Sequence, residues 1–589
     1  MIVGHPLEWS SSRKLFMFAS IRAGVLYSLI ANSVWINILA LTSPLFMLQV
    51  YDRVLVSGSV PTLVGLGVLA LGLYFCQAVL DILRSRLLLR IGERFDFEHG
   101  RRVHDAVIRA PLISRSPSDG LQPLRDLDGV RGFLQGSGST AFFDLPWIPV
   151  YLAICFLFHL WLGITATAGA IILVALTFAT SASTRKPITD ATRANMARSA
   201  ALEASRCNAE VIRAMGMTGR LQDRWQEINA TYAAANRSVG DMSSGFGIAA
   251  RTLRIVLQSA ILGVGAYLVI RQEVSPGIMI ASSIMMGRAM APVDLAIAQW
   301  RPFLQARQSW QRLQELLGRM PDHLDVTSLP DPQKELRVEG LVIVPPGARK
   351  PTVSNVAFQL NRGQALGVIG PSGSGKSTLA RALVGVWHPS HGKVRLDGAS
   401  LEQWDNAVLG GHVGYLPQAV ELFSGTIAEN ISRFQNEATS EEIVSAGKAA
   451  GAHDMIVSME KGYDTQIGEF GSELSAGQRQ RIGLARALFG TPFLVVLDEP
   501  NANLDAEGDM AVTHAIGSVR ERGGIVVVVA HRPSALSVVD AVLVMDRGIQ
   551  SAFGPRDEIL AKMTRQSSIR QGNARVTAPM VSLQARGDE

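Results

Sequence analysis

Long uncharged runs in the first half of the chain constrain its fold more than any other feature. Residues 23–51 and residues 54–80 contain no charged side chain. Each run exceeds the roughly 20 apolar residues that an α-helix needs to cross a bilayer. We therefore predict two membrane spans here, joined at Asp52-Arg53.

Four further spans follow from the same argument. Residues 145–184 carry no Asp, Glu, Lys or Arg, and the run is long enough for two spans that turn near its only histidine. Residues 255–270 predict a fifth span and residues 274–293 a sixth, which Arg288 interrupts. An ionisable group at membrane depth usually faces a bundle interior or a water-filled path, so Arg288 is expected to line the route or pair with Asp294. Snorkelling to the interface is the alternative.

Two arginine-rich segments, residues 81–144 and 185–254, separate the spans. Within them, residues 81–109 and 190–225 have helical spacing and few breakers, so the spans are expected to continue as helices beyond the membrane. The opposite side of the membrane offers almost only two arginines. This asymmetry predicts that both segments are cytoplasmic.

The composition supports a membrane part joined to a soluble part. Hydrophobic residues make up 48% and charged residues 18% of the 589 residues, which is apolar for a soluble protein. The net charge of +6 fits basic loops beside apolar spans, and no Lys/Arg tract with interleaved aromatics indicates a nucleic-acid partner. Three widely spaced cysteines indicate neither a disulfide framework nor a metal cluster. The first 18 residues lack the apolar core of a removable secretory signal.

A phosphate-binding loop defines the second half of the chain. Residues 370–377 read GPSGSGKS, between a strand predicted at 365–369 and a helix predicted at 377–386. The glycines let successive backbone N–H groups turn toward phosphate oxygens at the positive end of the helix dipole. Lys376 is predicted to reach the β- and γ-phosphates, and Ser377 to offer its hydroxyl to Mg²⁺. The predicted nucleotide-binding loop consists of Gly370, Pro371, Ser372, Gly373, Ser374, Gly375, Lys376, Ser377 and Thr378.

Two carboxylates end a second apolar run. Residues 493–497 read FLVVL and are followed by Asp498 and Glu499. Asp498 is placed to hold the Mg²⁺ shell, and Glu499 to polarise an attacking water as general base. Without the loop upstream, a surface Asp-Glu pair after a core strand would be the plainer interpretation.

Three more polar groups are candidates for the same site. His531 follows a valine-rich run and is predicted to contact the γ-phosphate, although a lone histidine is more often structural. Gln418 in YLPQ can touch the metal or the water, although a glutamine after a proline is usually a loop residue. The sequence LSAGQ at residues 474–478 places Ser475 and the Gly477 amide at the start of a predicted helix, a second anion-binding end.

Together these motifs resemble the ATP-binding cassette family. The resemblance identifies Gln418 as the glutamine loop, residues 474–478 as the signature, residues 503–505 as the D-loop and His531 as the switch histidine. It implies that two cassettes sandwich two ATP molecules, so a chain with one loop and one signature works as a homodimer. It implies ATP and Mg²⁺ as cofactors. The implied catalytic residues are Glu499, His531 and Lys376, the metal ligands are Ser377, Gln418 and Asp498, and the further nucleotide contacts are Gln418, Ser475, Gly477, Gln478 and Asp505.

The chain departs from the family pattern in two places. Ala476 replaces the more usual glycine of the signature, which a methyl group should tolerate. No aromatic side chain occurs from residue 311 to 357, where cassettes usually stack adenine. Ile343 or Val344 is therefore expected to give only an apolar contact to the base.

The membrane segments narrow the resemblance. Spans that precede a cassette in one chain resemble exporters, and TQIGE at residues 465–469 is similar to the exporter loop that touches the membrane domain, with Glu469 as the candidate coupling residue. Residues 44–55 and 143–147 are similar to the PrtD-like exporters of type I secretion, which move proteases and repeat-rich proteins.

This resemblance implies ATP-driven export of an unfolded protein with a C-terminal secretion signal across the inner membrane. It also implies a multi-pass protein with a cytoplasmic cassette, which works with a periplasmic adaptor and an outer-membrane channel. The alternative is an exporter of lipid or small amphiphilic molecules on the same frame. A polypeptide cargo needs a dimer-lined aqueous path, because its backbone groups find no partners in lipid.

The expected architecture is an α-helical membrane bundle of about six spans fused to an α/β P-loop cassette. Its segments are an N-terminal segment at 1–22, a membrane domain at 23–320, a linker at 321–334, an ATP-binding cassette at 335–563 and a flexible tail at 564–589.

Overall fold

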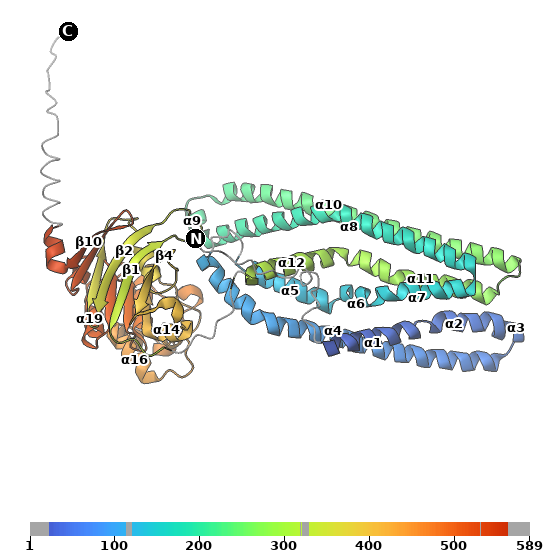
Figure 1. The fold of residues 1–589 in the computed structure, drawn as a ribbon, viewed down its shortest axis with the longest axis horizontal. Coiled ribbons are helices and arrows are strands. Elements are labelled where there is room, and N and C mark those ends of the chain that lie inside the picture. The colour runs from blue at the N-terminus through green and yellow to red at the C-terminus, as the bar shows by residue number, and fades with distance from the viewer. Residues whose placement is uncertain (1–22, 114–119, 319, 321–328, 531, 563–589) are drawn as a thin grey trace, which may run out of the picture. The chain divides into compact units, whose positions relative to one another are not determined.

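The structure is a computed structural model that describes residues 23–113, 120–318, 320, 329–530 and 532–562. The chain divides near residue 321 into a helical unit and a sheet-containing unit (Figure 1). The expected N-terminal segment, the expected tail and His531 lie outside the described residues.

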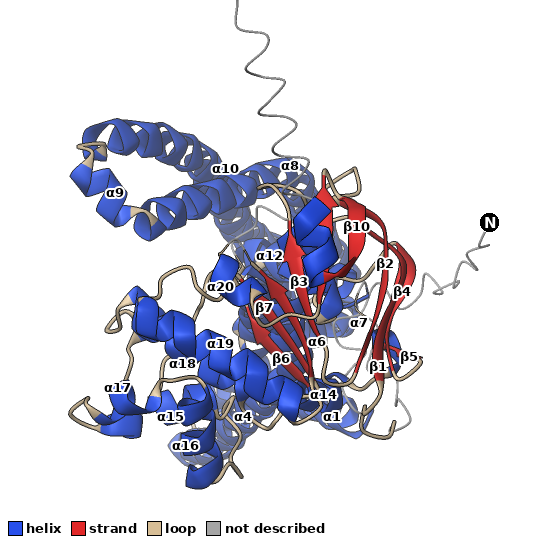
Figure 2. Cartoon of the chain, turned by 90° about the vertical axis from the view of Figure 1, so that its left-hand side faces the viewer, coloured by secondary structure: helices blue, strands red, loops and turns tan. Residues whose placement is uncertain are grey.

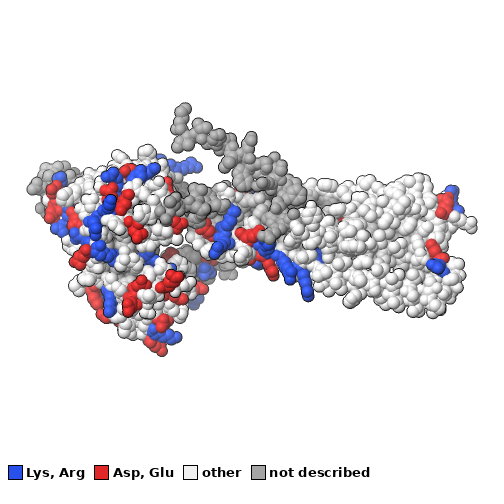
Figure 3. All heavy atoms as spheres, turned by 60° about the horizontal axis from the view of Figure 1, so that its bottom comes forward, with Lys and Arg blue, Asp and Glu red and all other residues white. Residues whose placement is uncertain are grey.

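The described residues of the helical unit contain six stretches that are long and apolar enough to cross a membrane, which agrees with the predicted number of spans. On the face seen in Figure 3, a broad surface of this unit carries almost no charged side chain. Its elements are α1 Ala23–Leu39, α2 Thr42–Gln49, the π-helix η2 Val50–Val54, α3 Leu55–Ser57, α4 Val60–Ile113, α5 Gln122–Gln135, α6 Ser137–Asp144, η3 Leu145–Trp147, α7 Ile148–Phe158, α8 Leu160–Cys207, α9 Ala209–Ala214, α10 Thr218–Ile270, α11 Pro276–Ala298 and α12 Trp300–Gly318.

Three helices are far longer than a bilayer requires. Helices α4, α8 and α10 contain 54, 48 and 53 residues, which at about 1.5 Å per residue is more than twice the thickness of the hydrocarbon core. Helices α8 and α10 lie side by side (Figure 1). The prediction that the spans continue as helices beyond the membrane is confirmed.

The turn between the first two spans differs from the prediction. It lies at Gly58-Ser59, where Gly58 has φ 62°, and not at Asp52-Arg53. Asp52 remains inside the helical segment because its carboxylate accepts hydrogen bonds from Ser275 Oγ at 2.5 Å and from the Gly277 N–H at 2.8 Å. These hydrogen bonds stabilise the Asp52 carboxylate at the amino end of α11. The helical segment that contains Asp52-Arg53 therefore continues past these two charged residues.

Asp144 joins three elements of the membrane unit. Its carboxylate accepts hydrogen bonds from Ser33 Oγ at 2.9 Å, Asn37 Nδ2 at 3.0 Å and Arg84 Nη1 at 3.1 Å. These donors lie on α1 and α4, whereas Asp144 ends α6. Because the charge is neutralised and hydrogen-bonded inside the bundle, the third span begins at Ser137 and continues through the Leu145–Trp147 turn.

The expected pairing of Arg288 with Asp294 is wrong. Asp294 Oδ2 instead accepts a hydrogen bond from Arg254 Nη1 at 2.7 Å. Arg288 and Asp294 are six residues apart on α11, which places them on different faces of a helix with 3.6 residues per turn. Arg288 is half-buried.

The second unit contains a ten-stranded sheet with the order β5-β4-β1-β2-β10-β9-β3-β8-β7-β6. Strands β9, β3, β8, β7 and β6 pair in parallel, and β10-β9, β2-β1, β1-β4 and β4-β5 pair antiparallel. The elements are β1 Glu335–Ile343, β2 Val353–Asn361, β3 Ala365–Ile369, α13 Lys376–Leu383, β4 His391–Leu396, β5 Ala399–Ser400, η4 Leu401–Gln403, α14 Asn406–His412, β6 Val413–Leu416, α15 Ile427–Ile431, α16 Ser440–Ala449, α17 His453–Val457, η5 Gly462–Asp464, η6 Glu469–Gly471, α18 Ala476–Leu488, β7 Leu494–Asp498, α19 Ala506–Glu521, β8 Ile525–Val529, α20 Pro533–Leu536, β9 Ala541–Asp546 and β10 Ile549–Pro555.

The parallel strands are buried on both faces. In β7, Val495 and Leu497 belong to the core that packs against α18 and α19, whereas Leu494 and Val496 belong to the core that contains α13 (Figure 2). Continuous apolar runs are therefore required, because neither face of these strands meets water. The strands of the cassette sheet were therefore predicted from short continuous Val/Leu runs and not from alternating apolar and polar residues.

Candidate functional site: a nucleotide site at the end of the parallel strands

The phosphate-binding loop connects β3 to the amino end of α13, as predicted. Gly370, Gly373 and Gly375 have φ angles of 156°, 77° and 93°. A Cβ atom at Gly370 would lie 2.1 Å from the Met545 carbonyl oxygen, and one at Gly375 would lie 2.9 Å from the Thr352 carbonyl oxygen. Both positions therefore require glycine, and the loop can present backbone N–H groups to an anion.

Lys376 folds back over this loop. Its Nζ donates hydrogen bonds of 2.9 Å to the carbonyl oxygens of Gly370 and Pro371. The side chain is buried, and burial lowers the pKa of Lys376 while the charges of Glu499 and Asp498 oppose that shift. An ammonium group is therefore held beside the loop, where it can bind phosphate oxygens by exchanging its carbonyl partners.

Asp498 ends β7 beside Ser377. Both carboxylate oxygens are buried, and neither receives a hydrogen bond from the residues that the structure describes. Burial raises the pKa of Asp498, and the charge of the neighbouring Glu499 adds to this shift. A buried carboxylate without donors costs free energy unless a cation or donor approaches. With the Ser377 hydroxyl, it supplies the hard oxygen ligands that suit Mg²⁺.

Glu499 and Gln418 meet although they are 81 residues apart. Gln418 Nε2 donates a hydrogen bond of 3.0 Å to Glu499 Oε2. Gln418 follows β6, which pairs with β7, so both side chains leave the same edge of the sheet. Glu499 has φ 53°, a strained conformation that the hydrogen bond from its N–H to the Val529 carbonyl oxygen at 3.0 Å helps to hold. The structure thus brings the predicted general base and the predicted metal or water ligand together.

The signature forms the amino end of α18. Ser475 is the N-cap, its Oγ accepts a hydrogen bond from the Gln478 N–H at 3.3 Å, and Gln478 Oε1 accepts one from the Ser475 N–H at 2.8 Å. Ser475 and Ala476 are exposed. Among the described residues, no hydrogen bond or ion pair joins residues 475–478 to residues 370–378. The Ala476 methyl group faces away from the core, so this chain accommodates it without a clash.

Contacts between α18 and the D-loop were not predicted from the sequence. Buried Gln480 donates from Nε2 to the Pro500 carbonyl oxygen at 3.0 Å, and Arg481 Nη2 donates to Asp505 Oδ1 at 2.8 Å. Asp505 also caps α19 by accepting from the Gly508 N–H at 2.8 Å. These two bonds, the Gly508 bond first, lower the pKa of Asp505. The polar run RQR directly after the signature indicated that such hydrogen bonds could form. The residues that accept them are identified only by the fold.

The expectation for the adenine contact needs correction. Ile343 is completely buried in the core beside α13, so it has no surface to offer a base. Val344, the first residue after β1, is half-buried, so it keeps some surface that a base could contact.

Comparisons with known proteins agree with this geometry. Residues 353–502 match the ABC transporter family, and residues 27–293 match the ABC transporter transmembrane region. The type I secretion system ATP-binding protein PrsD of Rhizobium meliloti is 53% identical over 542 residues, which cover 92% of this chain and 93% of that protein. The cyclolysin secretion/processing ATP-binding protein CyaB of Bordetella pertussis is 29% identical, over 90% of this chain and 75% of that protein.

A solved structure shares the whole fold. The structure of a bacterial Atm1-family ABC exporter with ATP bound has a TM-score of 0.78 to this chain at 21% identity, and the match covers 95% of this chain and all of the other. At that identity the likeness concerns the fold alone. The high identity to PrsD over nearly both full lengths, the two family matches and the assembled nucleotide site establish that the chain belongs to the ATP-binding cassette exporters of type I secretion systems.

Proposed function

We propose that this chain exports an unfolded polypeptide with a C-terminal secretion signal across the inner membrane, as a homodimer driven by ATP hydrolysis. The observation that carries the proposal is the meeting of the phosphate-binding loop, Asp498 and the Gln418–Glu499 pair in a chain whose other unit has six membrane spans. The names of the relatives support it, since PrsD and CyaB are both described as secretion ATP-binding proteins.

The residues of the site divide the work of hydrolysis. The loop glycines and Lys376 bind the phosphates, and Glu499 takes a proton from the attacking water as general base. Gln418 orients Glu499 through their 3.0 Å hydrogen bond. Ser377, Asp498 and Gln418 are the proposed ligands of Mg²⁺, which supplies charge neutralisation of the phosphates when bound. His531 remains a proposed γ-phosphate contact.

The homodimer follows from an incomplete site. Ser475 and the amide at Gly477 form an exposed anion-binding end that contacts no phosphate-loop residue of its own chain through the described hydrogen bonds. A second copy can bring its signature to this loop. Gln478 shapes the Ser475 turn, and Asp505 positions α19 and α18 together, so both act on the nucleotide from the partner side.

Coupling to the membrane unit is assigned to the loop at residues 465–469. Its backbone is joined to the loop that follows Gln418 by bonds from the Ile467 N–H to the Gly425 carbonyl oxygen at 3.1 Å and from the Ile427 N–H to the Thr465 carbonyl oxygen at 3.1 Å. Glu469 is exposed. A movement of Gln418 on ATP binding would therefore be transmitted to Glu469, the proposed coupling residue.

Reconstitution of the full chain in liposomes with a candidate cargo tests this function. Cargo should reach the lumen only with ATP, and the Lys376→Ala variant should abolish both ATP turnover and transport, because the charge contact to the phosphates is lost. A cargo with its C-terminal segment deleted is the matched control. ATP-dependent transfer of lipid, with no transfer of any polypeptide, would contradict the proposal. The periplasmic adaptor and the outer-membrane channel are the proposed partners for release outside the cell.

A further inference from the structure

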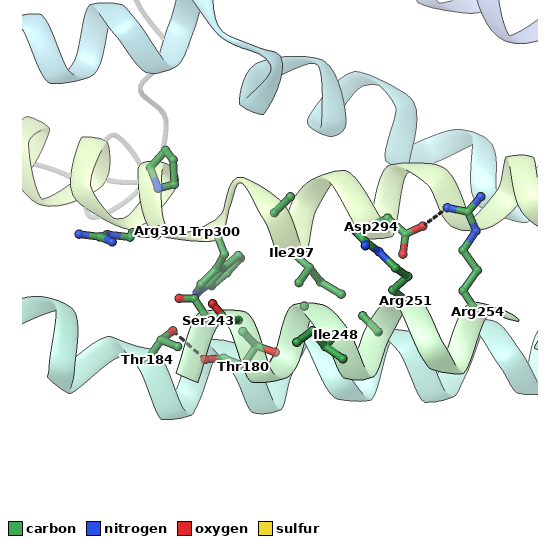
Figure 4. Close-up of a pocket in the computed structure, with 15 residues that line it drawn as sticks. Thr180, Thr184, Ser243, Ile248, Arg251, Arg254, Asp294, Ile297, Trp300 and Arg301 are labelled. Atoms are coloured by element: carbon green, nitrogen blue, oxygen red, sulfur yellow. Dashed lines mark hydrogen bonds and ion pairs between the residues drawn. The ribbon is translucent and has the colours of Figure 1, made fainter. Parts of the chain in front are cut away.

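A large cavity lined by charged, hydroxyl and apolar side chains lies in the helical unit. It has a volume of about 690 Å³ and lies between α8, α10 and the junction of α11 with α12 (Figure 4). Its lining includes the guanidinium groups of Arg251, Arg254 and Arg301 and one carboxylate, that of Asp294. Three positive charges therefore share the cavity with one negative charge.

The partners of these arginines leave positive charge available. Arg254 Nη1 binds Asp294 at 2.7 Å, and Arg301 Nη2 donates to Asn236 Oδ1, a neutral acceptor, at 3.0 Å. Arg251 is exposed and has no hydrogen-bond or ion-pair partner within the described part of the chain. Figure 4 shows Arg251 and Arg254 extending from α10 toward Asp294 on α11. Guanidinium groups with unused donors are well suited to bind a carboxylate in a bidentate manner.

A second, smaller cavity of the helical unit is apolar. Its volume is about 160 Å³, and its exposed lining is almost entirely apolar. Trp300 lines both cavities, and its indole N–H is buried without an acceptor among the described residues. The other large side chains of the lining are Phe133, Phe142, Val174, Phe178 and Phe303.

The larger cavity lies where the uncharged spans end. Thr180 and Thr184 in its wall close the uncharged run of residues 145–184, and Arg254 directly precedes the run of residues 255–270. In the proposed orientation, this is the cytoplasmic end of the spans. A cargo chain that comes from the cytoplasm therefore meets this level of the spans before it meets the bilayer centre.

We infer that these two cavities, which share Trp300 in their walls, receive a cargo segment that carries a carboxylate beside a large apolar side chain. The excess of guanidinium groups favours the carboxylate and repels basic segments. The smaller cavity offers room for one aliphatic or aromatic side chain but is too small for a pair of lipid acyl chains. The inference rests on the proposed function, because it names the chemistry by which that function selects its cargo.

Peptide binding to the full-length protein tests this assignment. The protein is placed in nanodiscs of zwitterionic phosphatidylcholine, and the probe is a fluorescein-labelled, amidated peptide GSGSDLGSGS, followed by fluorescence anisotropy. Matched peptides replace the Asp-Leu pair by Asn-Leu or by Asp-Ser. The Asp-Leu peptide should bind about tenfold more tightly than the Asn-Leu peptide, which is the size of one hydrogen-bonded charge contact.

Substitutions on α10 test whether the difference in peptide affinity arises in the larger cavity. Arg251→Gln should weaken binding of the Asp-Leu peptide about tenfold and leave the Asn-Leu peptide unchanged, and Arg251→Lys should restore part of the loss. Arg237→Gln is the matched control, since Arg237 is an exposed arginine of the same helix outside the cavity. Thermal unfolding of each variant shows whether it is folded.

Three results would overturn the assignment. They are equal binding of the Asp-Leu and Asn-Leu peptides, equal losses in Arg251→Gln and Arg237→Gln, and binding of phosphatidylglycerol through Arg251 by a protein that does not bind the peptide. Each can occur while the reconstituted protein still exports cargo, and the proposed function would then stand without this site. Failure of ATP-driven export with every polypeptide would instead refute the function.

Discussion

Arg433 is a single side chain on which the position of the signature helix depends. It follows α15, has φ 56°, and donates hydrogen bonds to five backbone carbonyl oxygens. Three of these, at Arg486, Ala487 and Phe489, lie at the carboxyl end of α18 at 3.0, 3.3 and 3.2 Å. The other two, at Gly410 and Val413, lie at 2.5 and 3.3 Å before β6 and at its first residue. The guanidinium thus joins the helix to the sheet.

The Arg433→Ala variant should lose about 3 kcal/mol of unfolding free energy. Two of the five bonds are 3.0 Å or shorter, and a hydrogen bond to a charged group contributes about 1.5 kcal/mol or more, whereas the three longer bonds contribute less. For a domain of about 200 residues, each kcal/mol lowers the Tm by about 2–4 °C. A fall of about 6–12 °C is therefore expected in the Tm of the cassette, measured by intrinsic fluorescence on the purified full-length protein.

Two variants make this prediction specific. Arg522→Ala is the control, because Arg522 is an exposed arginine with one such bond, to the Pro492 carbonyl oxygen at 3.1 Å. It should lower the Tm by less than half as much. Arg433→Lys should be intermediate, since an ammonium has three donors and cannot span five carbonyl groups. If Arg433→Ala were no less stable than Arg522→Ala, the reasoning would be refuted.

Three further substitutions test other parts of the structure. Glu499→Gln should still bind ATP but hydrolyse it at least about 100-fold more slowly, as measured by nucleotide binding and phosphate release, because the general base is lost. Ala476→Gly should change the KM for ATP less than about threefold in steady-state kinetics, because the methyl group is exposed and clashes with nothing in its own chain. Asp144→Ala should cost about 2–3 kcal/mol, less than the about 3–5 kcal/mol for a broken buried pair, because Arg84 and Asp144 are only half-buried and Asp81 still binds Arg84 at 3.0 Å. Removing Arg84 as well should recover part of this loss in thermal unfolding, and an unchanged Tm in Asp144→Ala would contradict the assigned network.

The sequence alone was sufficient for the spans and the catalytic motifs, because both depend on neighbouring residues. An uncharged run of 20 residues or more must leave water whatever it packs against, so the first four spans were predictable from three such runs, whereas the fifth and sixth were predicted from a shorter run and from one that Arg288 interrupts. The glycines of residues 370–375 and Lys376 act through the local turn that they themselves form, and the structure reproduces that turn. The same holds for Ser475 and Gln478, whose mutual hydrogen bonds lie within one helical turn.

Tertiary structure decided which distant side chains meet, because a charged side chain pairs with the polar or oppositely charged group that packing places beside it. Asp52 stays within a helix only because Ser275 lies beside it, and Asp294 binds Arg254 on another helix rather than Arg288 on its own. Burial decided the rest. Ile343 and Val344 are adjacent and chemically alike, yet Ile343, the last residue of β1, is completely buried in the core, whereas Val344, just after the strand, is partly exposed.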